Sequence, residues 1–330
     1  MRIVIYGAGA IGGAVGAFRF VAGGDVVLIA RGAHYEALAR DGLTLVTPSS
    51  TTTLGVPVVD DPAAIDWRAD DVVFLCMKSQ DSTDALARLR DAAGGDVAVC
   101  CVQNGVENER LAARLFAAVY GGCIQCPATH LEPGVIETHS EPITGIIDVG
   151  CWPSGTDETA VAMAAALEAA TFSSIVRPDI MRWKYAKLLM NLTNALEALC
   201  GTAARSGAVA KLLRAEAETC LGAAGIDFAA SAEERERRGN LVANRQPHPE
   251  RSGGSSTWQS VQRGVGRIEA DYLNGEIVLL GKQLGIETPA NELVRRLANE
   301  LARSRGEPAT MSEDALLAEI TASAGNPTIS

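Results

Sequence analysis

The sequence predicts an α/β fold in which a doubly wound, mainly parallel sheet is followed by an all-helical domain. Strand-like and helix-like patterns alternate up to residue 178, and the strand-like runs at 71–77 and 97–102 are continuously apolar apart from Asp71. Such continuous apolar runs are typical of parallel strands that are covered on both faces. From Pro178 onward the strand patterns stop, and apolar residues recur with the helical period of 3.6. We therefore divide the chain into domains 1–178 and 179–330.

Local patterns predict the elements of the first domain in order. An apolar run at 3–6 predicts a strand, the small-residue stretch 13–20 a helix, and the run at 25–30 a second strand. Further strands are expected at 71–77, 97–102, 135–138, 145–149 and 174–176, and further helices at 81–93, 108–119 and 157–170.

The second domain is expected to contain helices only. Their patterns cover 180–199, 208–224, 257–284 and 291–303. The charge run 233–238 suggests a solvated helix face or a loop, and the stretch QPHPERSGGS at 246–255 suggests a loop between helices. After Arg305 the chain is polar and poor in aromatic residues, so we expect residues 305–330 to form a loosely ordered tail.

Composition excludes several classes of protein. A net charge of −11 without any basic run gives no support for a nucleic-acid partner. No apolar stretch reaches the roughly 18 residues that span a membrane, and the N-terminus has no signal-peptide pattern. We expect a cytoplasmic protein without a membrane partner; a homodimer is left open.

The eight cysteines do not form a metal-binding pattern. Cys123 and Cys126 are spaced as C-x-x-C, but no second such pair and no paired histidines accompany them. Several others lie in apolar strand-like runs, where a free cysteine behaves as a small hydrophobic residue. We expect reduced thiols and no metal site.

A glycine-rich motif directly follows the first strand. Its residues are Gly7, Ala8, Gly9, Ala10, Ile11 and Gly12. In a strand–turn–helix context the first glycine allows the tight turn, the second lets the backbone approach a pyrophosphate, and the third allows close helix–strand packing. The motif predicts a Rossmann-type dinucleotide site, although a glycine-rich turn without a ligand is the alternative.

The end of the second strand indicates which dinucleotide is bound. Sites that prefer NAD usually place a carboxylate there for the ribose 2′-hydroxyl, whereas this chain has Arg31 and no carboxylate. A guanidinium suits a 2′-phosphate. The sequence therefore favours NADPH/NADP⁺ over NAD, with an ordinary surface arginine as the alternative.

Two further strand ends carry polar side chains. Lys78 and Asn104 follow the strands at 71–77 and 97–102, and ligands of open α/β sheets bind outside the carboxyl ends of the strands. The amide of Asn104 can both donate and accept, which suits the cofactor's carboxamide or a substrate oxygen. A solvated strand end and an ordinary Asn-Gly turn are the alternatives.

A polar stripe runs along the first helix of the second domain. Lys187, Asn191 and Asn194 are spaced i, i+4 and i+7, so they share one side of a continuous helix, and Lys184 lies on much the same side. A buried polar stripe is costly unless it has partners, so a stripe that lines a substrate cleft explains it better. An exposed polar face is the alternative.

Several motifs occur in the same order as in a known family. They are GAGAIG at 7–12, Met77-Lys78, Gln103-Asn104-Gly105, the run 187–191, Ser255-Ser256, and the run 269–275. Over about residues 1–300 this chain resembles the ketopantoate reductase (2-dehydropantoate 2-reductase) family. The resemblance implies an NADPH-dependent enzyme with a Rossmann domain, a helical C-terminal domain and an active site that uses both.

The resemblance also implies roles for individual residues. Lys187 would be the catalytic lysine and Glu269 its acidic companion, while Asn191 and Ser256 would contact the substrate. Asn104 and Lys78 would stand at the nicotinamide end, and Arg31 would bind the 2′-phosphate. Ser256 has a competing interpretation, because with Gln259 it fits a helix capping box.

Two departures from the family lie on the substrate side. Ala195 stands where a second asparagine is usual, with Asn194 one position earlier, and the residues after Ser256 read Thr-Trp-Gln-Ser where Met-Leu-Gln-Asp is more usual. These changes concern the identity of the substrate and not the type of reaction.

The sequence thus supports one leading function and two alternatives. The leading function is NADPH-dependent reduction of the small 2-oxo acid 2-dehydropantoate to pantoate, in pantothenate synthesis. A related reductase of another 2-oxo acid is the first alternative. A non-catalytic NADP(H)-binding sensor is the second, although a sensor has no need of Lys187 and Glu269.

Overall fold

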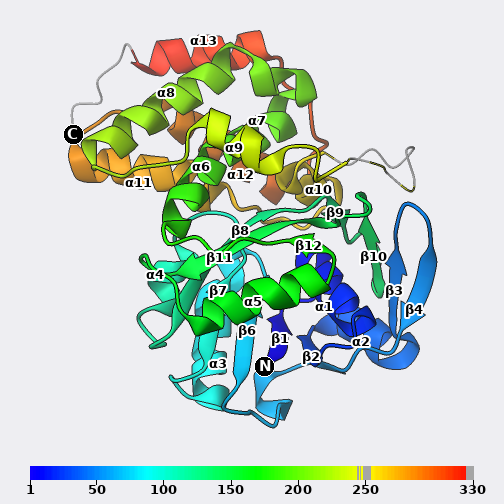
Figure 1. Ribbon diagram of the computed structural model, residues 1–330. Coiled ribbons are helices and arrows are strands. Elements are labelled where there is room, and N and C mark those ends of the chain that lie inside the picture. The colour runs from blue at the N-terminus through cyan, green and yellow to red at the C-terminus, as the bar shows by residue number, and fades with distance from the viewer. Residues whose placement is uncertain (244, 246, 248–253, 325–330) are drawn as a thin grey trace. The chain divides into compact units, whose positions relative to one another are not determined.

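The structure is a computed structural model, which describes residues 1–243, 245, 247 and 254–324 (Figure 1). The chain divides into two compact units. The first contains Met1–Lys184 and Ala229–Arg251, and the second contains Tyr185–Phe228 and Ser252–Ser330. The chain first enters the second unit after Lys184, whereas the sequence places the boundary after residue 178, and no sequence pattern indicates that the chain later returns to the first unit.

The first unit is built on an eight-stranded sheet, which confirms the predicted doubly wound fold. All neighbouring strands are parallel except β8 and β11, which pair antiparallel. In spatial order the strands are β12 (Phe172–Ser173), β11 (Gly145–Cys151), β8 (Val119–Gln125), β7 (Ala98–Cys101), β6 (Asp71–Leu75), β1 (Arg2–Tyr6), β2 (Val26–Ile29) and β5 (Val58–Val59).

Helices cover both faces of this sheet. Side chains of β1 alternate between two hydrophobic clusters, with Ile3 and Ile5 on one face and Val4 on the other. The first cluster includes α1 (Ala10–Val21) and α5 (Glu158–Ala169), and the second includes α3 (Ser82–Ala93) and α4 (Asn108–Ala112). Burial on both faces explains why the central strands are continuously apolar.

Apart from the expected strand at 135–138, the remaining elements of the first unit are not indicated by the sequence patterns. A second sheet has the order β4 (Thr51–Leu54), β3 (Leu43–Val46), β10 (Val135–Thr138) and β9 (Ala128–Thr129). It contacts α1, where Gly13 leaves room for Ile136. The remaining elements are α2 (Gly32–Asp41) and the 3₁₀ turns η1 (Pro62–Ala64) and η2 (Ser79–Asp81).

The predicted helix at 108–119 is wrong beyond Ala112. The chain turns there and then forms β8 inside the sheet. Gly121 and Gly122 interrupt the apolar pattern of β8, which is why the sequence hides this strand. A Cβ at Gly121 would crowd Ile180 and Lys184, so the glycines allow close approach of neighbouring segments.

The second unit is helical, as predicted. Its helices are α7 (Thr193–Cys200), α8 (Ala208–Ala223), α10 (Ser256–Gln262), α11 (Asn274–Leu284), α12 (Pro289–Ser304) and α13 (Glu313–Ala324), with the 3₁₀ turns η3 (Thr202–Ser206) and η4 (Ala270–Tyr272). Helix α6 (Ile180–Asn191) begins in the first unit and ends in the second.

Three expectations for this half need correction. The stretch 257–284 is not one helix, because Gly264 and Gly266 adopt positive φ angles between α10 and η4. The stretch 180–199 is divided at Leu192 into α6 and α7. The tail expected at 305–330 contains α13, in which Leu316 and Ile320, spaced i, i+4, are buried. Residues 325–330 and most of the predicted loop 246–255 lie outside the described residues.

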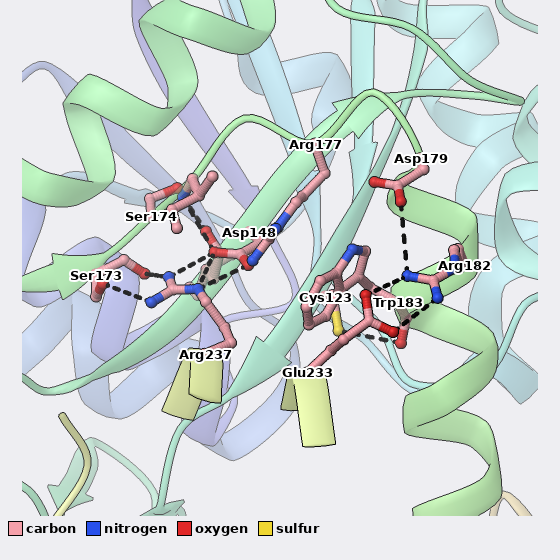
Figure 2. A network of polar contacts seen from close by, with 12 residues as sticks. Cys123, Asp148, Ser173, Ser174, Arg177, Asp179, Arg182, Trp183, Glu233 and Arg237 are labelled. Atoms are coloured by element: carbon pink, nitrogen blue, oxygen red, sulfur yellow. Dashed lines mark hydrogen bonds and ion pairs between the residues drawn. The ribbon is translucent and has the colours of Figure 1, made fainter. Parts of the chain in front are cut away.

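Helix α9 (Ser231–Arg238), which is the charge run of the sequence, belongs to the first unit and is fixed there by ion pairs (Figure 2). The guanidinium of Arg237 donates hydrogen bonds to both carboxylate oxygens of Asp148 on β11, at 2.6 to 3.1 Å. Arg177 donates to the same carboxylate at 3.0 Å. One turn earlier, Glu233 accepts two hydrogen bonds from Arg182, at 2.7 and 2.8 Å.

In the described part of the chain, no helix is long and apolar enough to cross a membrane.

Replacing Arg237 with alanine should lower the free energy of unfolding by about 1.5–3 kcal/mol, the range for hydrogen bonds to charged groups. The reason is that Asp148, whose side chain is 3% exposed, would lose the better buried of its two guanidinium partners. Urea unfolding measures the loss. Arg235→Ala is the matched control, since Arg235 is exposed on the same helix and should change stability by about 0.5 kcal/mol or less. Equal losses in the two variants would contradict the role given to Arg237.

Candidate active site

The glycine motif forms a tight turn between β1 and α1. Gly7 has a φ of +100°, and a Cβ there would collide with the backbone of Met77 at the end of β6. A Cβ at Gly12 would collide with the carbonyl oxygen of Gly7 and with the side chain of Ile5. Both positions therefore require glycine, for the turn and for the packing of α1 against β1.

The middle glycine has a different environment. Gly9 is the N-cap residue of α1, no side chain caps this helix end, and a Cβ added to Gly9 would meet no atom within 4 Å. The first N–H groups of a helix have no partner within the helix, and together with the helix dipole they attract anions. This end of α1 therefore fits the pyrophosphate of a dinucleotide.

Arg31 lies just beyond β2, as the N-cap residue of α2. Its side chain is 75% exposed, and its Nη2 lies 3.0 Å from a carboxylate oxygen of Asp81 in η2. The Arg31 guanidinium is accessible to a phosphate, but the Asp81 carboxylate already partly neutralises its positive charge. No sequence pattern associates Asp81 with this site.

The strands bring the other predicted residues of the first unit to the same edge. Tyr6 pairs with Leu75, and Leu75 pairs with Cys101, so β1, β6 and β7 end level with one another. Lys78 and Asn104 follow the ends of β6 and β7, beside the turn at Gly7. The parallel register therefore places the glycine motif, Lys78 and Asn104 at one edge of the sheet.

Buried hydrogen bonds fix the two turns that carry Lys78 and Asn104. The Gln103 amide donates to the Met77 carbonyl oxygen at 2.9 Å and to the Ser82 hydroxyl at 2.7 Å. The Asn108 amide donates to the Ser79 hydroxyl at 3.0 Å and accepts from Ser82 at 2.7 Å. Asn108, Ser79 and Ser82 were not identified from the sequence, since single polar residues after strand ends resemble ordinary turn residues.

Lys184 on α6 is buried and is hydrogen-bonded to the turn after β7. Its Nζ donates to the carbonyl oxygens of Cys101 and Gln103, both at 3.0 Å, and forms an ion pair with Glu109. The side chains of Lys184 and Glu109 are 2% and 0% exposed. Burial has the largest single influence and acts to lower the pKa of Lys184, but Glu109 together with the neighbouring Cys101 and Cys123 raises this pKa on balance. A charged Lys184 thus ties the start of α6 to the end of β7.

The predicted residues of the second unit lie on several helices. Lys187 and Asn191 lie on α6, while Asn194 lies on α7 beyond the division at Leu192, so the stripe is not continuous. Asn194 is 5% exposed, and its side-chain oxygen accepts a hydrogen bond from Arg205 at 3.2 Å. Asn194 therefore has a hydrogen-bond partner within its own unit. Its contact with a substrate stays a prediction.

The capping role expected of Ser256 belongs to Ser255. The Ser255 hydroxyl accepts from the backbone N–H of Trp258, and Ser256 is the first residue of α10. Gln259 donates to the carbonyl oxygen of Gly254 at 3.0 Å and closes no capping box with Ser256. The sequence offers two adjacent serines, and the capping pattern does not distinguish them.

The motif at 269–275 contains the predicted site residue Glu269 and the buried Asn274, which forms hydrogen bonds within the second unit. Glu269 is 7% exposed and is the N-cap residue of η4. The amide of Asn274 donates to the carbonyl oxygen of Leu192 at 3.1 Å and to the side chain of Asn291 at 3.0 Å. Asn274 therefore supports the division between α6 and α7, next to Asn191.

The predicted site residues thus form one set in each unit. The glycine motif, Arg31, Lys78 and Asn104 belong to the first unit, and Lys187, Asn191, Asn194, Ser256 and Glu269 belong to the second. The eight cysteines are free thiols, and within the described ranges no three His, Cys, Asp or Glu side chains are grouped to hold a metal ion.

Replacing Lys184 with methionine should lower the free energy of unfolding by about 3–5 kcal/mol, because removal of one partner leaves a buried charge uncompensated. The double variant Lys184→Met, Glu109→Leu should be more stable than Lys184→Met alone, since both charges are then gone. Thermal and urea unfolding measure both effects, with the exposed Lys211→Met as control. A double variant less stable than the single one would show that the ion pair is not the source of the loss.

Comparison with known proteins identifies the family. Residues 3–154 match the protein family described as "Ketopantoate reductase PanE/ApbA". Residues 179–302 match the family described as "Ketopantoate reductase PanE/ApbA C terminal". The 2-dehydropantoate 2-reductase of Pyrococcus horikoshii is 30% identical over 309 residues, which are 89% of this chain and 95% of that protein. The 2-dehydropantoate 2-reductase of Archaeoglobus fulgidus is 30% identical over 304 residues, which are 90% of this chain and 96% of that protein.

A solved structure agrees with these matches. The PanE/ApbA family ketopantoate reductase of Ralstonia eutropha JMP134 superimposes with a TM-score of 0.77 at 28% identity, over 92% of this chain and 99% of that one. Both halves of the chain therefore match in sequence, and most of its length matches in structure. The chain belongs to the ketopantoate reductase family and is an oxidoreductase.

Proposed function

We propose that this protein reduces 2-dehydropantoate to pantoate with NADPH, in pantothenate biosynthesis. The observation that carries the proposal is the uncapped end of α1 at the level edge of three parallel strands, in a chain whose relatives are named 2-dehydropantoate 2-reductases. Bound NADPH would supply the hydride. The α1 N-terminus would hold its pyrophosphate, Arg31 its 2′-phosphate, and Lys78 and Asn104 would serve its nicotinamide end.

The second unit would supply the acid. Hydride transfer to a ketone builds negative charge on the carbonyl oxygen, and a proton donor at that oxygen lowers the barrier. Lys187 would donate this proton, and Glu269 would keep it charged or orient it. Asn191, Asn194 and Ser256 would contact the carboxylate and hydroxyl groups of the substrate, together with Asn104.

One observation favours a second candidate, a reductase of another 2-oxo acid. Ala195 replaces the family's usual asparagine, and the nearby Asn194 already accepts a hydrogen bond from Arg205. NADPH oxidation over a panel of 2-oxo acids that includes 2-dehydropantoate tests both candidates. Highest kcat/KM with 2-dehydropantoate supports the first, and a preference for another acid supports the second. Tight NADPH binding without turnover of any acid would favour a sensor.

Arg31→Ala should weaken NADPH binding by about 1.5–3 kcal/mol, the range for hydrogen bonds to charged groups, and barely change NADH binding. The reason is that only NADPH carries the 2′-phosphate. Dissociation constants of both cofactors, measured by nucleotide fluorescence, give the comparison.

Two further variants sharpen this test. Asp81→Asn removes the carboxylate beside Arg31 and should strengthen NADPH binding relative to NADH. Arg40→Ala, an exposed arginine at the other end of α2, should leave both constants unchanged. Equal losses of NADPH and NADH affinity in Arg31→Ala would show that Arg31 does not recognise the 2′-phosphate.

Lys187→Ala should lower kcat by about 10²- to 10⁴-fold, the usual contribution of general acid catalysis, while NADPH still binds. Lys184→Ala is the contrasting variant. It should lower the stability of the protein, because Lys184 forms a buried ion pair. It should reduce kcat of the folded enzyme by about tenfold or less, because that ion pair already engages its ammonium group. Steady-state kinetics with unfolding curves separates the two effects. If Lys184→Ala abolishes turnover and Lys187→Ala does not, Lys187 is not the proton donor.

A further inference from the structure

His34 connects the glycine motif to a distant turn of the first unit. It is the third residue of α2 and lies three residues after Arg31. Its Nε2 lies 2.7 Å from the carbonyl oxygen of Ala8, and the backbone N–H of Gly134 donates to its Nδ1 at 3.0 Å. The ring also stacks at a tilt on His130, with 4.1 Å between the ring centroids.

These two contacts define the protonation of the ring. A carbonyl oxygen only accepts hydrogen bonds and a backbone N–H only donates them, so Nε2 carries the proton and Nδ1 is bare. His34 is therefore neutral, and burial lowers its pKa in the same direction. In this tautomer the ring acts as a rigid bridge between Gly134 and Ala8.

The bridge determines the direction of the neighbouring N–H. The peptide between Ala8 and Gly9 is planar and trans, so its carbonyl and its N–H point in opposite directions. When His34 holds the carbonyl oxygen, the N–H of Gly9 must point away from His34. Ala8 lies between two glycines, whose backbones rotate easily, so this peptide plane needs an external anchor.

We infer that His34 is a positioning residue for the dinucleotide, which holds the Ala8–Gly9 peptide so that the Gly9 N–H is directed toward the pyrophosphate. This inference rests on the proposed use of a nicotinamide dinucleotide. Helix α2 then serves the cofactor twice, through Arg31 at its N-cap and through His34 one turn later. The two residues differ in what they recognise, because the pyrophosphate is common to NADPH and NADH whereas the 2′-phosphate is not.

Two substitutions separate the halves of the bridge. The amide of glutamine reaches the place of Nε2 and can still donate to Ala8, whereas the amide of asparagine reaches only the place of Nδ1 and can still accept from Gly134. His34→Asn should raise the dissociation constants of NADPH and NADH alike by roughly two- to tenfold, the effect of one ordinary hydrogen bond. His34→Gln should bind both cofactors nearly as tightly as the unmodified protein.

The same measurements can overturn the inference. Unchanged affinity in a folded His34→Asn variant would do so, as would equal weakening in both variants or an effect on NADPH alone. Because a variant can fail to fold, the ring nitrogens of His34 are also observed by NMR in the unmodified protein. Protonation at Nε2 is expected, and a ring protonated at Nδ1 would refute the bridge.

The outcome is distinct from that of the proposed function. If the unmodified protein binds neither cofactor, the proposed cofactor and the role of His34 fall together. If it binds a cofactor and responds to His34→Asn as expected but turns over no 2-oxo acid, the reductase proposal fails while the role of His34 stands.

Discussion

Close packing of α1 against the ends of β1 and β6 is the constraint on which the candidate active site depends. A Cβ added at Gly12 would collide with the carbonyl oxygen of Gly7 and with Cys76, and a Cβ added at Gly7 would collide with the backbone of Met77, so α1 and its preceding turn leave no room for side chains beside these two strand ends. Larger side chains at either position would push the helix outward. The uncapped N–H groups of α1 would then no longer lie at the edge where Lys78 and Asn104 follow their strands.

A set of buried hydrogen bonds keeps the turn at this edge of the sheet in one conformation. The turn after β7 is tied by Gln103 to Met77 and Ser82, and by Lys184 to α6. Such buried polar bonds contribute modestly to net stability, but an alternative conformation would leave charged and amide groups without partners. The turn that presents Asn104 is therefore specified by hydrogen bonding more than by apolar packing.

The sequence predicts the parts of the fold that depend on local patterns. The glycine motif, the apolar strands β1, β6 and β7 and most helices of the second unit depend on spacing within a few residues. Strand β8 was missed because Gly121 and Gly122 break its apolar pattern. A Cβ would crowd Ile180 at Gly121 and Val102 at Gly122, and no local pattern reveals these tertiary contacts.

The same limit applies to individual side chains. Lys184 and Lys187 are one turn apart on α6 and look alike in sequence, and only the position of Glu109, 75 residues earlier, shows that Lys184 is buried. The link from His34 to Ala8 and Gly134 likewise joins segments that no periodicity connects. Local patterns indicate candidate residues for the chemistry, but they do not indicate the tertiary partners of those residues.

The return of the chain to the first unit makes that unit discontinuous in sequence. Three covalent connections join the two units, where a simple tandem arrangement would have one: they lie at 184–185, at 228–229 and between residues 247 and 254. A fragment that ends near residue 184 would lack α9, and the carboxylate of Asp148 would lose Arg237. Recombination at a single junction therefore cannot exchange either unit as a whole. We expect the two units of this protein to evolve as one piece.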